Sequence, residues 1–302
     1  MELGMVGLGR MGANMAERLV RSGHRVVGFD PGAPAREQAA GRGIEAASSL
    51  AELVERLPSP RAVWLMVPAG EIVDRTLADL LPLLSPGDAV IDGGNSFYKD
   101  TMRRAAMLAE HRIECLDCGT SGGVWGLVEG YSLMVGGDAV VVERLRPIFA
   151  ALAPAPDRGW GRVGPSGAGH FTKMVHNGIE YGMMQAYAEG FAIMQRKDDF
   201  ALDLPQVAEI WRHGSVVRSW LLDLSADALR KNPALDGIAP YVQDSGEGRW
   251  TVAEAIDLNV SAPVITLSLL ERLRSREDDS FADKLLAAMR NEFGGHGIKK
   301  SG

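Results

Sequence analysis

The strongest constraint on the fold is an alternation of short apolar segments with helical segments, which runs through the first part of the chain and then stops. From Ser166 onward the sequence has helical periodicity and no convincing strand, and residues 166–196 can form one long helix. Strands that alternate with helices form βαβ units and a largely parallel sheet. The sequence therefore predicts an α/β domain over residues 1–164 and an all-α domain over residues 165–302. The apolar segments typical of strands are LGMVGL, HRVVGFD, RAVWLMVP, DAVIDGG, RIECLDCGT and YSLMVGG.

A glycine motif after the first apolar segment indicates that the α/β domain is a Rossmann-like dinucleotide-binding domain. GLGRMG, residues 7–12, has the spacing G-x-G-x-x-G and stands between a predicted strand and a predicted helix. In that context Gly7 permits a tight turn, Gly9 lets the backbone approach a pyrophosphate, and Gly12 lets the helix pack closely on the strand. The helix N-terminus offers N–H donors to the anion. The predicted cofactor-binding residues of this turn are Gly7, Leu8, Gly9, Arg10, Met11 and Gly12.

An acidic residue at the end of the second predicted strand indicates which dinucleotide binds. Asp30 can accept hydrogen bonds from the adenosine ribose, whereas it would repel the 2′-phosphate of NADP. The first arginine after Asp30 is Arg36, and either Arg36 or Arg10 can still reach a phosphate. We therefore expect NAD as the cofactor and NADP as a weaker one.

Two further segments follow predicted strands and are expected at the same site. They are MVPAG, residues 66–70, and DGGN, residues 92–95. Ligands of open parallel sheets bind at the carboxyl ends of the strands. We therefore expect Met66 and Val67 at the cofactor, and Asn95 either between nicotinamide and substrate or as a simple turn residue.

Cys115 and Cys118 have the C-x-x-C spacing of redox and zinc sites, but both lie in RIECLDCGT, which is typical of a strand. Strand residues at this separation are about 10 Å apart and point to opposite faces, whereas a disulfide needs Cα atoms within about 7 Å. We expect both cysteines to be structural. No other histidine or cysteine pattern predicts a metal site.

Charge and apolar patterning exclude several classes of function. The formal net charge is −7 and the pI is about 5.5, so a broad basic surface for nucleic acid is not expected. No apolar run is long enough to span a bilayer, and no signal peptide is visible before the first strand. Together with a content of two cysteines, these features predict a cytoplasmic protein that binds neither nucleic acid nor a membrane.

The segment KMVHNGIEYG, residues 173–182, carries the candidate catalytic side chains. In a helix Lys173, Asn177 and Glu180 share one face, and His176 flanks it. One interpretation is an amphipathic helix whose polar face is solvated. The other is a catalytic face, because asparagine and glycine are poor helix formers that a solvated face rarely collects. The residues expected beside or opposite this face are His170, Phe171, Met174, Val175, Ile179 and Met183.

A lysine and a carboxylic acid on one helix suit a defined chemistry. Desolvation disfavours the charged form of a lysine and makes it a usable base. Lys173 as the base and Glu180 as the acid would suit the oxidation of an alcohol, followed by a protonation elsewhere on the substrate.

Several segments resemble the β-hydroxyacid dehydrogenase superfamily and, within it, the decarboxylating 6-phosphogluconate dehydrogenases. GLGRMGANMAERLVRSGH is similar to the superfamily's N-terminal fingerprint, and the run Lys-x-x-His-Asn-Gly-x-Glu-Tyr, residues 173–181, resembles the catalytic helix of the 6-phosphogluconate branch. The resemblance covers nearly the whole chain. It is to the short bacterial members, which lack a second helical repeat and are often associated with NAD. Further matching segments are IDGGNSFYKDT, GTSGGVWG, YSLMVGG and GRWT.

The resemblance implies oxidative decarboxylation of 6-phospho-D-gluconate to D-ribulose 5-phosphate and CO2, a reaction of the pentose phosphate pathway and of gluconate utilisation. It implies that Lys173 removes the proton of the 3-hydroxyl and that Glu180 protonates the enediol left after CO2 is lost. The 3-keto oxygen accepts the electron pair, so no metal is needed. The implied substrate-binding residues are Asn95, Ser121, Gly122, Gly123, His176, Asn177, Tyr181, Arg272, Arg290 and His296.

The C-terminal run RNEFGGH resembles a family motif that is normally lent to the active site of a neighbouring subunit. The resemblance places Arg290 and His296 in a partner's site. It implies a homodimer or homotetramer, with a helical domain that serves both substrate binding and oligomerisation. The alternative for these two residues is an exposed helix end.

Two departures from the family pattern bear on specificity. Longer members carry a phosphate-binding lysine where this chain has Ser245, within DSGEGRWT. One cation is missing unless Arg249 replaces it, which leaves phosphate affinity and the tolerance of unphosphorylated gluconate open. Val124 and Trp125 stand where an acidic pair is frequent.

Two other functions remain as alternatives. One is a non-decarboxylating β-hydroxyacid dehydrogenase of the 3-hydroxyisobutyrate type, but such relatives typically carry Lys-x-x-x-Asn without the histidine and the Glu-Tyr pair. The other is a non-catalytic NAD-binding regulator, since a fold alone does not establish activity. The presence of both Lys173 and Glu180 argues against the regulator.

Overall fold

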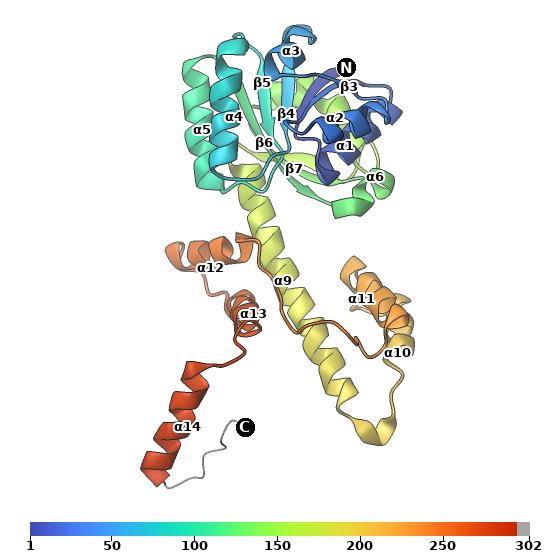
Figure 1. Cartoon of the computed structure of the whole chain (residues 1–302), viewed down its shortest axis with the longest axis vertical. Helices are drawn as coiled ribbons and strands as arrows, with labels where there is room; N and C mark the ends of the chain where they lie inside the picture. The colour runs from blue at the N-terminus through green and yellow to red at the C-terminus, as the bar shows by residue number, and fades with distance from the viewer. Residues whose placement is uncertain (295–302) are drawn as a thin grey trace. The chain divides into compact units, whose positions relative to one another are not determined.

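The computed structural model describes residues 1–294 (Figure 1). The chain divides into two compact units, Met1–Asn177 and the residues from Gly178 onward. Helix α9, Ala168–Gln195, spans the division, and it confirms the predicted long helix. The predicted domain boundary at residue 164 coincides with the end of the last strand, β8 (Trp160–Gly164).

The first unit is built on one eight-stranded sheet with the order β3-β2-β1-β4-β5-β6-β7-β8. Neighbouring strands run parallel except β6 and β7, which pair antiparallel, so the largely parallel sheet is confirmed. The edge strands β3 and β8 are not evident in the sequence, because neither has a run of buried side chains. The strands are β1 (Glu2–Val6), β2 (Arg25–Phe29), β3 (Glu45–Ala46), β4 (Ala62–Leu65), β5 (Ala89–Asp92), β6 (Glu114–Ser121), β7 (Ser132–Gly136) and β8 (Trp160–Gly164).

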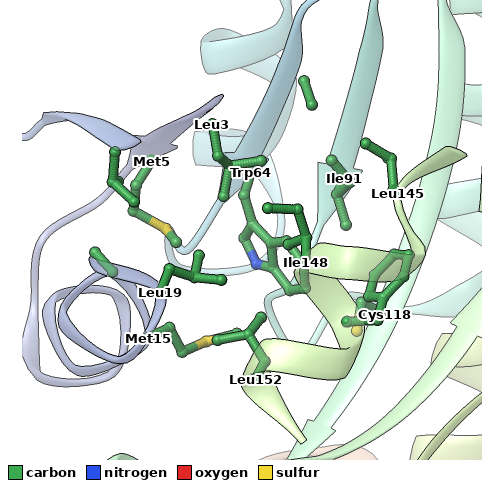
Figure 2. Packing of buried hydrophobic residues seen from close by; sticks show 14 of the residues in the cluster. Leu3, Met5, Met15, Leu19, Trp64, Ile91, Cys118, Leu145, Ile148 and Leu152 are labelled. Carbon is green, nitrogen blue, oxygen red and sulfur yellow. The ribbon is translucent and has the colours of Figure 1, made fainter. Parts of the chain in front are cut away.

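Helices cover the sheet and enclose an apolar core on each of its faces (Figure 1). Successive strand residues point to opposite faces, so Trp64 of β4 belongs to one core while its neighbours Val63 and Leu65 belong to the other. In the first core Trp64 lies near Ile91 and Ile148 (Figure 2). The helices of this unit that precede α9 are α1 (Arg10–Arg21), α2 (Ala33–Ala40), α3 (Leu50–Glu55), α4 (Glu71–Leu80), α5 (Tyr98–Glu110), α6 (Gly126–Glu129), α7 (Ala139–Arg144) and α8 (Arg146–Leu152).

The two cysteines lie in β6 on opposite faces of the sheet, as the strand pattern predicts. Cys118 is buried in the same core as Trp64, whereas Cys115 packs against the other core. Burial raises the pKa of the Cys115 thiol to about 12, because an apolar environment disfavours the thiolate. Neither thiol is placed for redox chemistry.

The second unit is helical over its described residues. Ala208, Ala226 and Leu229 form a small buried cluster that packs α10 against α11. Helix α12 begins at Glu247, within the DSGEGRWT segment. None of the described helices is both long and apolar enough to cross a membrane. The helices after α9 are α10 (Leu204–Arg212), α11 (Trp220–Lys231), α12 (Glu247–Asp257), α13 (Pro263–Arg274) and α14 (Phe281–Gly294).

Candidate active site

The glycine turn between β1 and α1 has the geometry that a dinucleotide site requires. Gly7 has a φ of +94°, and a Cβ added there would lie 2.4 Å from the carbonyl oxygen of Met66. A Cβ on Gly12 would lie 1.9 Å from the carbonyl oxygen of Gly7. By contrast, a Cβ added to Gly9 would meet no heavy atom of residues 1–294 within 4 Å, apart from its neighbours along the chain; Gly9 is exposed at the start of α1. The backbone is therefore open to an anion at Gly9 and closed by packing on either side.

The other residues of this turn divide between packing and exposure. Leu8 is buried in the first core, and Met11 packs against that core. Arg10 is exposed at the first position of α1. The groups that face solvent at this turn are therefore those of Gly9 and Arg10, while Leu8 and Met11 hold the turn on the sheet.

Asp30 fixes the glycine turn through its carboxylate. One oxygen accepts the N–H of Leu8 at 2.9 Å and the other accepts the N–H of Gly32 at 2.8 Å. Arg36 donates to the carbonyl oxygens of Asp30 and Pro31, at 2.7 and 3.1 Å. A carboxylate has about four acceptor positions, so ribose hydroxyls can still bind. These residues fit an adenine dinucleotide with free ribose hydroxyls.

The ends of β4 and β5 lie at the same edge of the sheet. Met66 and Val67 follow β4 and are half-buried, and the N–H of Met66 donates to the carbonyl oxygen of Val6 at 2.7 Å. At the end of β5, the carboxylate of Asp92 accepts the N–H of Gly94 at 3.1 Å and the hydroxyl of Ser96 at 2.6 Å. Asn95 lies between these anchored residues and is exposed, so its amide can face a ligand while the loop stays fixed.

Arg104 of α5 lies next to Asp92, the residue that precedes this loop, and the sequence motifs do not identify it. It is buried and donates to both carboxylate oxygens of Asp74, at 2.9 and 3.0 Å, and to the carbonyl oxygen of Gly70 at 3.0 Å. Its Nη1 lies 3.9 Å from Asp92. The hydrogen bond from Arg104 lowers the pKa of Asp74 to about 2. The signal in the sequence was an arginine at a core-facing position of a predicted helix.

The start of α9 is seated on β6 by contacts that the sequence does not reveal. The buried carboxylate of Asp117 accepts the N–H groups of Gly167 and His170, each at 2.7 Å, which satisfies donors at the helix N-terminus. A Cβ added to Gly119 would lie 2.4 Å from the Cβ of Lys173. The backbone of β6 at Gly119 therefore packs directly against the side chain of Lys173, the candidate base on α9.

Lys173 lies in a buried polar cluster. Lys173 and Asn177 are 7% and 8% exposed, and Nζ of Lys173 donates to the Asn177 Oδ1 at 2.7 Å. His176 Nδ1 lies 3.4 Å from Nζ and 3.1 Å from the same Oδ1. The interpretation of a solvated polar face is therefore wrong for this part of α9. Ile179, expected on the opposite apolar face, is instead 52% exposed.

The loop after β6 carries the residues predicted to hold the substrate carboxylate. Ser121 ends β6, and Gly122 and Gly123 have φ values of +134° and +52°, which side-chain-bearing residues rarely adopt. Val124 and Trp125 follow and are exposed. Glycine adopts these conformations without strain; Ser121 and Gly122 are half-buried and Gly123 is exposed, so the polar groups of this loop are partly accessible.

In the second unit, Tyr181 and Arg272 lie together. The Tyr181 hydroxyl accepts the N–H of Ser245 at 3.2 Å, and the guanidinium carbon of Arg272 lies 3.4 Å from the centroid of the Tyr181 ring. A Cβ added to Gly248 would lie 2.5 Å from that ring. A small residue is thus required where α12 packs on α9.

The remaining predicted residues are placed as follows. Glu180 is half-buried on α9, and Arg249 donates twice to Asp244, at 3.1 Å each. Arg290 is exposed on α14. His296 lies outside the described residues. The first unit therefore gathers the glycine turn, Asn95, the loop at 121–123 and the Lys173 cluster, while the second unit carries the remaining described residues.

A glycine turn open to a pyrophosphate, an acidic residue at the ribose position and a buried lysine on the helix that follows the sheet define a dinucleotide-dependent dehydrogenase. Comparison with known proteins specifies the family. Models of the NAD-binding domain and of the C-terminal domain of 6-phosphogluconate dehydrogenase match residues 2–161 and 169–294. The chain belongs to the 6-phosphogluconate dehydrogenase family.

Individual relatives agree with this assignment. The chain is 46% identical over 301 residues to a Haloferax volcanii protein named as an NAD(+)-dependent, decarboxylating 6-phosphogluconate dehydrogenase, and the match covers 99% of both chains. It is also 46% identical over 300 residues to Bacillus subtilis YqeC, whose name places it among the 6-phosphogluconate dehydrogenases, with 99% and 100% of the two chains covered. The Plasmodium falciparum 6-phosphogluconate dehydrogenase structure superposes with a TM-score of 0.86 at 28% identity, over 100% of this chain and 66% of that one.

Proposed function

We propose that this chain oxidatively decarboxylates 6-phospho-D-gluconate to D-ribulose 5-phosphate and CO2 with NAD as the hydride acceptor. The observation that carries the proposal is the burial of Lys173 in hydrogen-bonding contact with Asn177, because a general base needs a desolvated and oriented amine. The name of the Haloferax relative supports both the reaction and the cofactor.

The glycine turn would hold the pyrophosphate through the open backbone at Gly9, and Asp30 would accept the adenosine ribose hydroxyls. A carboxylate at this position disfavours a 2′-phosphate, and Arg36 is engaged with main-chain carbonyls. Both features favour NAD over NADP. When bound, NAD accepts the hydride that leaves C3 of the substrate.

Lys173 takes the proton of the substrate 3-hydroxyl as the hydride leaves, which yields a 3-keto acid. Asn177 and His176 hold the substrate hydroxyls and keep Nζ oriented. Ser121 and the backbone N–H groups of Gly122 and Gly123 receive the carboxylate, and Asn95 contacts the substrate beside the nicotinamide. Fixing these groups before the reaction lowers the entropy lost in the transition state.

The carboxylate then leaves as CO2 and the electron pair of the broken bond passes to the keto oxygen, which takes the proton from protonated Lys173 to give an enediol. Glu180 delivers a proton to C1 of the enediol while the hydroxyl proton returns to Lys173, which leaves the ketose. No metal takes part in these steps. The proposed reaction consumes 6-phosphogluconate and produces a pentose phosphate, and we propose a role in the pentose phosphate pathway on that ground.

We also propose a homodimer or homotetramer in which the second unit provides the interface and Arg290 and His296 complete a partner's site. Large apolar side chains are exposed on its helices, including Ile193, Val264 and Phe281, and exposed apolar patches mark interaction surfaces. Sedimentation equilibrium tests this assembly. A fully active monomer would contradict it.

The first experiment is an initial-rate assay of reduced nicotinamide with 6-phosphogluconate, using NAD and NADP in parallel. Gluconate and 3-hydroxyisobutyrate are the control substrates. We expect fast reduction of NAD by 6-phosphogluconate together with release of CO2. Turnover of 3-hydroxyisobutyrate without CO2 would favour the non-decarboxylating alternative, and cofactor binding without any turnover would favour a regulator.

A further inference from the structure

The loop before α12 is held by an unusual concentration of arginines. Arg272 donates to the carbonyl oxygen of Gln243 at 2.9 Å, and Arg276, just after α13, donates to the carbonyl oxygen of Val242 at 3.3 Å. Arg249 reaches the same loop from α12. Three guanidinium groups from two helical segments therefore meet one short loop of the second unit.

Asp244 forms ion pairs with two of these arginines, Arg249 and Arg276. Its side chain is 5% exposed and accepts from Arg249 at 3.1 Å and from Arg276 at 2.7 Å. Arg249 and then Arg276 hold the pKa of the Asp244 carboxyl below its usual range. The carboxylate therefore stays charged and fixes two cationic side chains, of which 49% and 27% remain exposed.

The local charges determine whether this loop can hold an anion. Arg249, Arg272 and Arg276 contribute three positive charges, against the carboxylates of Asp244 and of buried Glu247. Ser245, which hydrogen-bonds to Glu247, contributes no cation. Without Arg276 the group would be formally neutral, and with it one positive charge remains.

We propose that Arg276, positioned by Asp244, determines the specificity of this chain for phosphorylated substrates and binds the substrate phosphate together with Arg249 and Arg272. The inference rests on the proposed function and supplies the cation that Ser245 lacks. The hydrogen bonds of Arg276 use Nε and Nη2, so Nη1 is available to a phosphate oxygen. Guanidinium groups favour phosphate because their donors match its oxygens in pairs.

The test compares Arg276→Met with Arg274→Met. Arg274 is the last residue of α13, two residues before Arg276; it is 62% exposed and lies 3.7 Å from the carboxylate of Asp283. For Arg276→Met we expect the KM for 6-phosphogluconate and the competitive inhibition constant of inorganic phosphate to rise about tenfold, the usual worth of one hydrogen bond to a charged group. The kcat and the KM for NAD should stay within about twofold, and Arg274→Met should match the wild type.

Two further variants separate binding from folding. Arg276→Lys keeps the charge but loses the paired donors, so its KM should lie between those of the wild type and Arg276→Met. Asp244→Asn should raise the KM because Arg249 and Arg276 lose their anchor. An unchanged KM and an unchanged phosphate inhibition constant in folded Arg276→Met, judged by its melting temperature, would overturn the proposal.

Titration calorimetry with inorganic phosphate keeps this inference distinct from the proposed function. If the wild type failed to oxidise 6-phosphogluconate yet bound phosphate more tightly than Arg276→Met, the proposed reaction would be wrong and the anion site would stand. If the wild type oxidised 6-phosphogluconate but bound phosphate no more tightly than Arg276→Met, the proposed reaction would stand and the proposed role of Arg276 would be wrong.

Discussion

Asp74 in the first unit and Asp244 in the second each bind two arginines, but the two clusters are built in opposite ways. In the first unit Arg104 is 2% exposed, and Asp74 lies at the surface, where it also contacts Arg103. In the second unit Asp244 is buried and its two arginines reach outward. A buried arginine with an outer carboxylate supports the fold, whereas a buried carboxylate with outer arginines presents positive charge to a ligand.

The two units also differ in the amount of apolar core around these clusters. The first unit has an extensive core on each face of its sheet, and its loops are anchored to those cores. The described part of the second unit has a small buried cluster and many exposed apolar side chains. The first unit is therefore organised as a self-contained scaffold, and we infer that the second is organised around contacts with ligands and partners.

The largest expected effect tests how catalysis is divided between the units. Lys173→Met in the first unit should lower kcat by about 10³, and Glu180→Gln in the second by about 10², within the range of general acid–base contributions. Binding of NAD, measured by fluorescence titration, should be unchanged in both.

Lys197→Met is the matched control for Lys173→Met, because Lys197 is exposed and pairs only locally with Asp199. It should retain wild-type activity. Full activity in Lys173→Met would remove the lysine from the mechanism, and equal losses in Lys173→Met and Lys197→Met would point to a general effect of charge.

A second experiment tests the rigidity of the first unit at the glycine turn. Gly12→Ala places a Cβ against the carbonyl oxygen of Gly7, so we expect a loss of about 3 kcal/mol in the free energy of unfolding. Gly9→Ala has open space and should keep its stability while it weakens NAD binding. Urea unfolding and cofactor titration measure both variants. Similar free energies of unfolding for Gly12→Ala and Gly9→Ala would show that the glycine turn can relax around the new Cβ at position 12.

The Asp74 cluster predicts a pH dependence that belongs to the first unit. The pKa of Asp74 is lowered from 3.8 to about 2 in the folded protein. Its contribution to stability is therefore fully present above about pH 4 and is lost as the pH falls toward 2. Because Asp74 is partly exposed, we expect a contribution of about 1 kcal/mol.

Urea unfolding at several pH values checks this contribution. The difference in stability between the wild type and Asp74→Asn should narrow as the pH decreases below 4. Asp157→Asn, at an exposed position, should show no such trend. If the difference in unfolding free energy between the wild type and Asp74→Asn did not change with pH, the charge of Asp74 would not be the source of the stabilisation.

The smallest expected effect concerns α9 within the second unit. Within the described part of the chain, a Cβ added to Gly190 would meet no heavy atom within 4 Å beyond the backbone of its own helix, so Gly190→Ala should stabilise the helix by about 0.5–1 kcal/mol. Gly178→Ala should instead destabilise, because the new Cβ would lie 2.7 Å from Thr251. Thermal unfolding compares the two. Destabilisation by Gly190→Ala would mean that a second copy packs against this part of α9.

The sequence predicted the features that depend on local pattern. The alternation of strands and helices, the glycine turn and the long helix all follow from spacing and residue type, and β6 separates the two cysteines as expected. The partners of Asp117, Gly119, Arg104 and Arg276 could not be predicted, because each of these residues acts through a contact with a residue distant in the chain. The burial of Lys173 was left open for the same reason: periodicity gives the face of a helix but not what covers it.

The contact between Gly119 and the stem of Lys173 limits how this enzyme can be re-engineered. A library that varies residues 119–123 to change the substrate range would yield few folded variants at its first position, since even one methyl group there meets Lys173. Diversity is better placed at Val124 and Trp125, which follow the two glycines of this loop and are exposed.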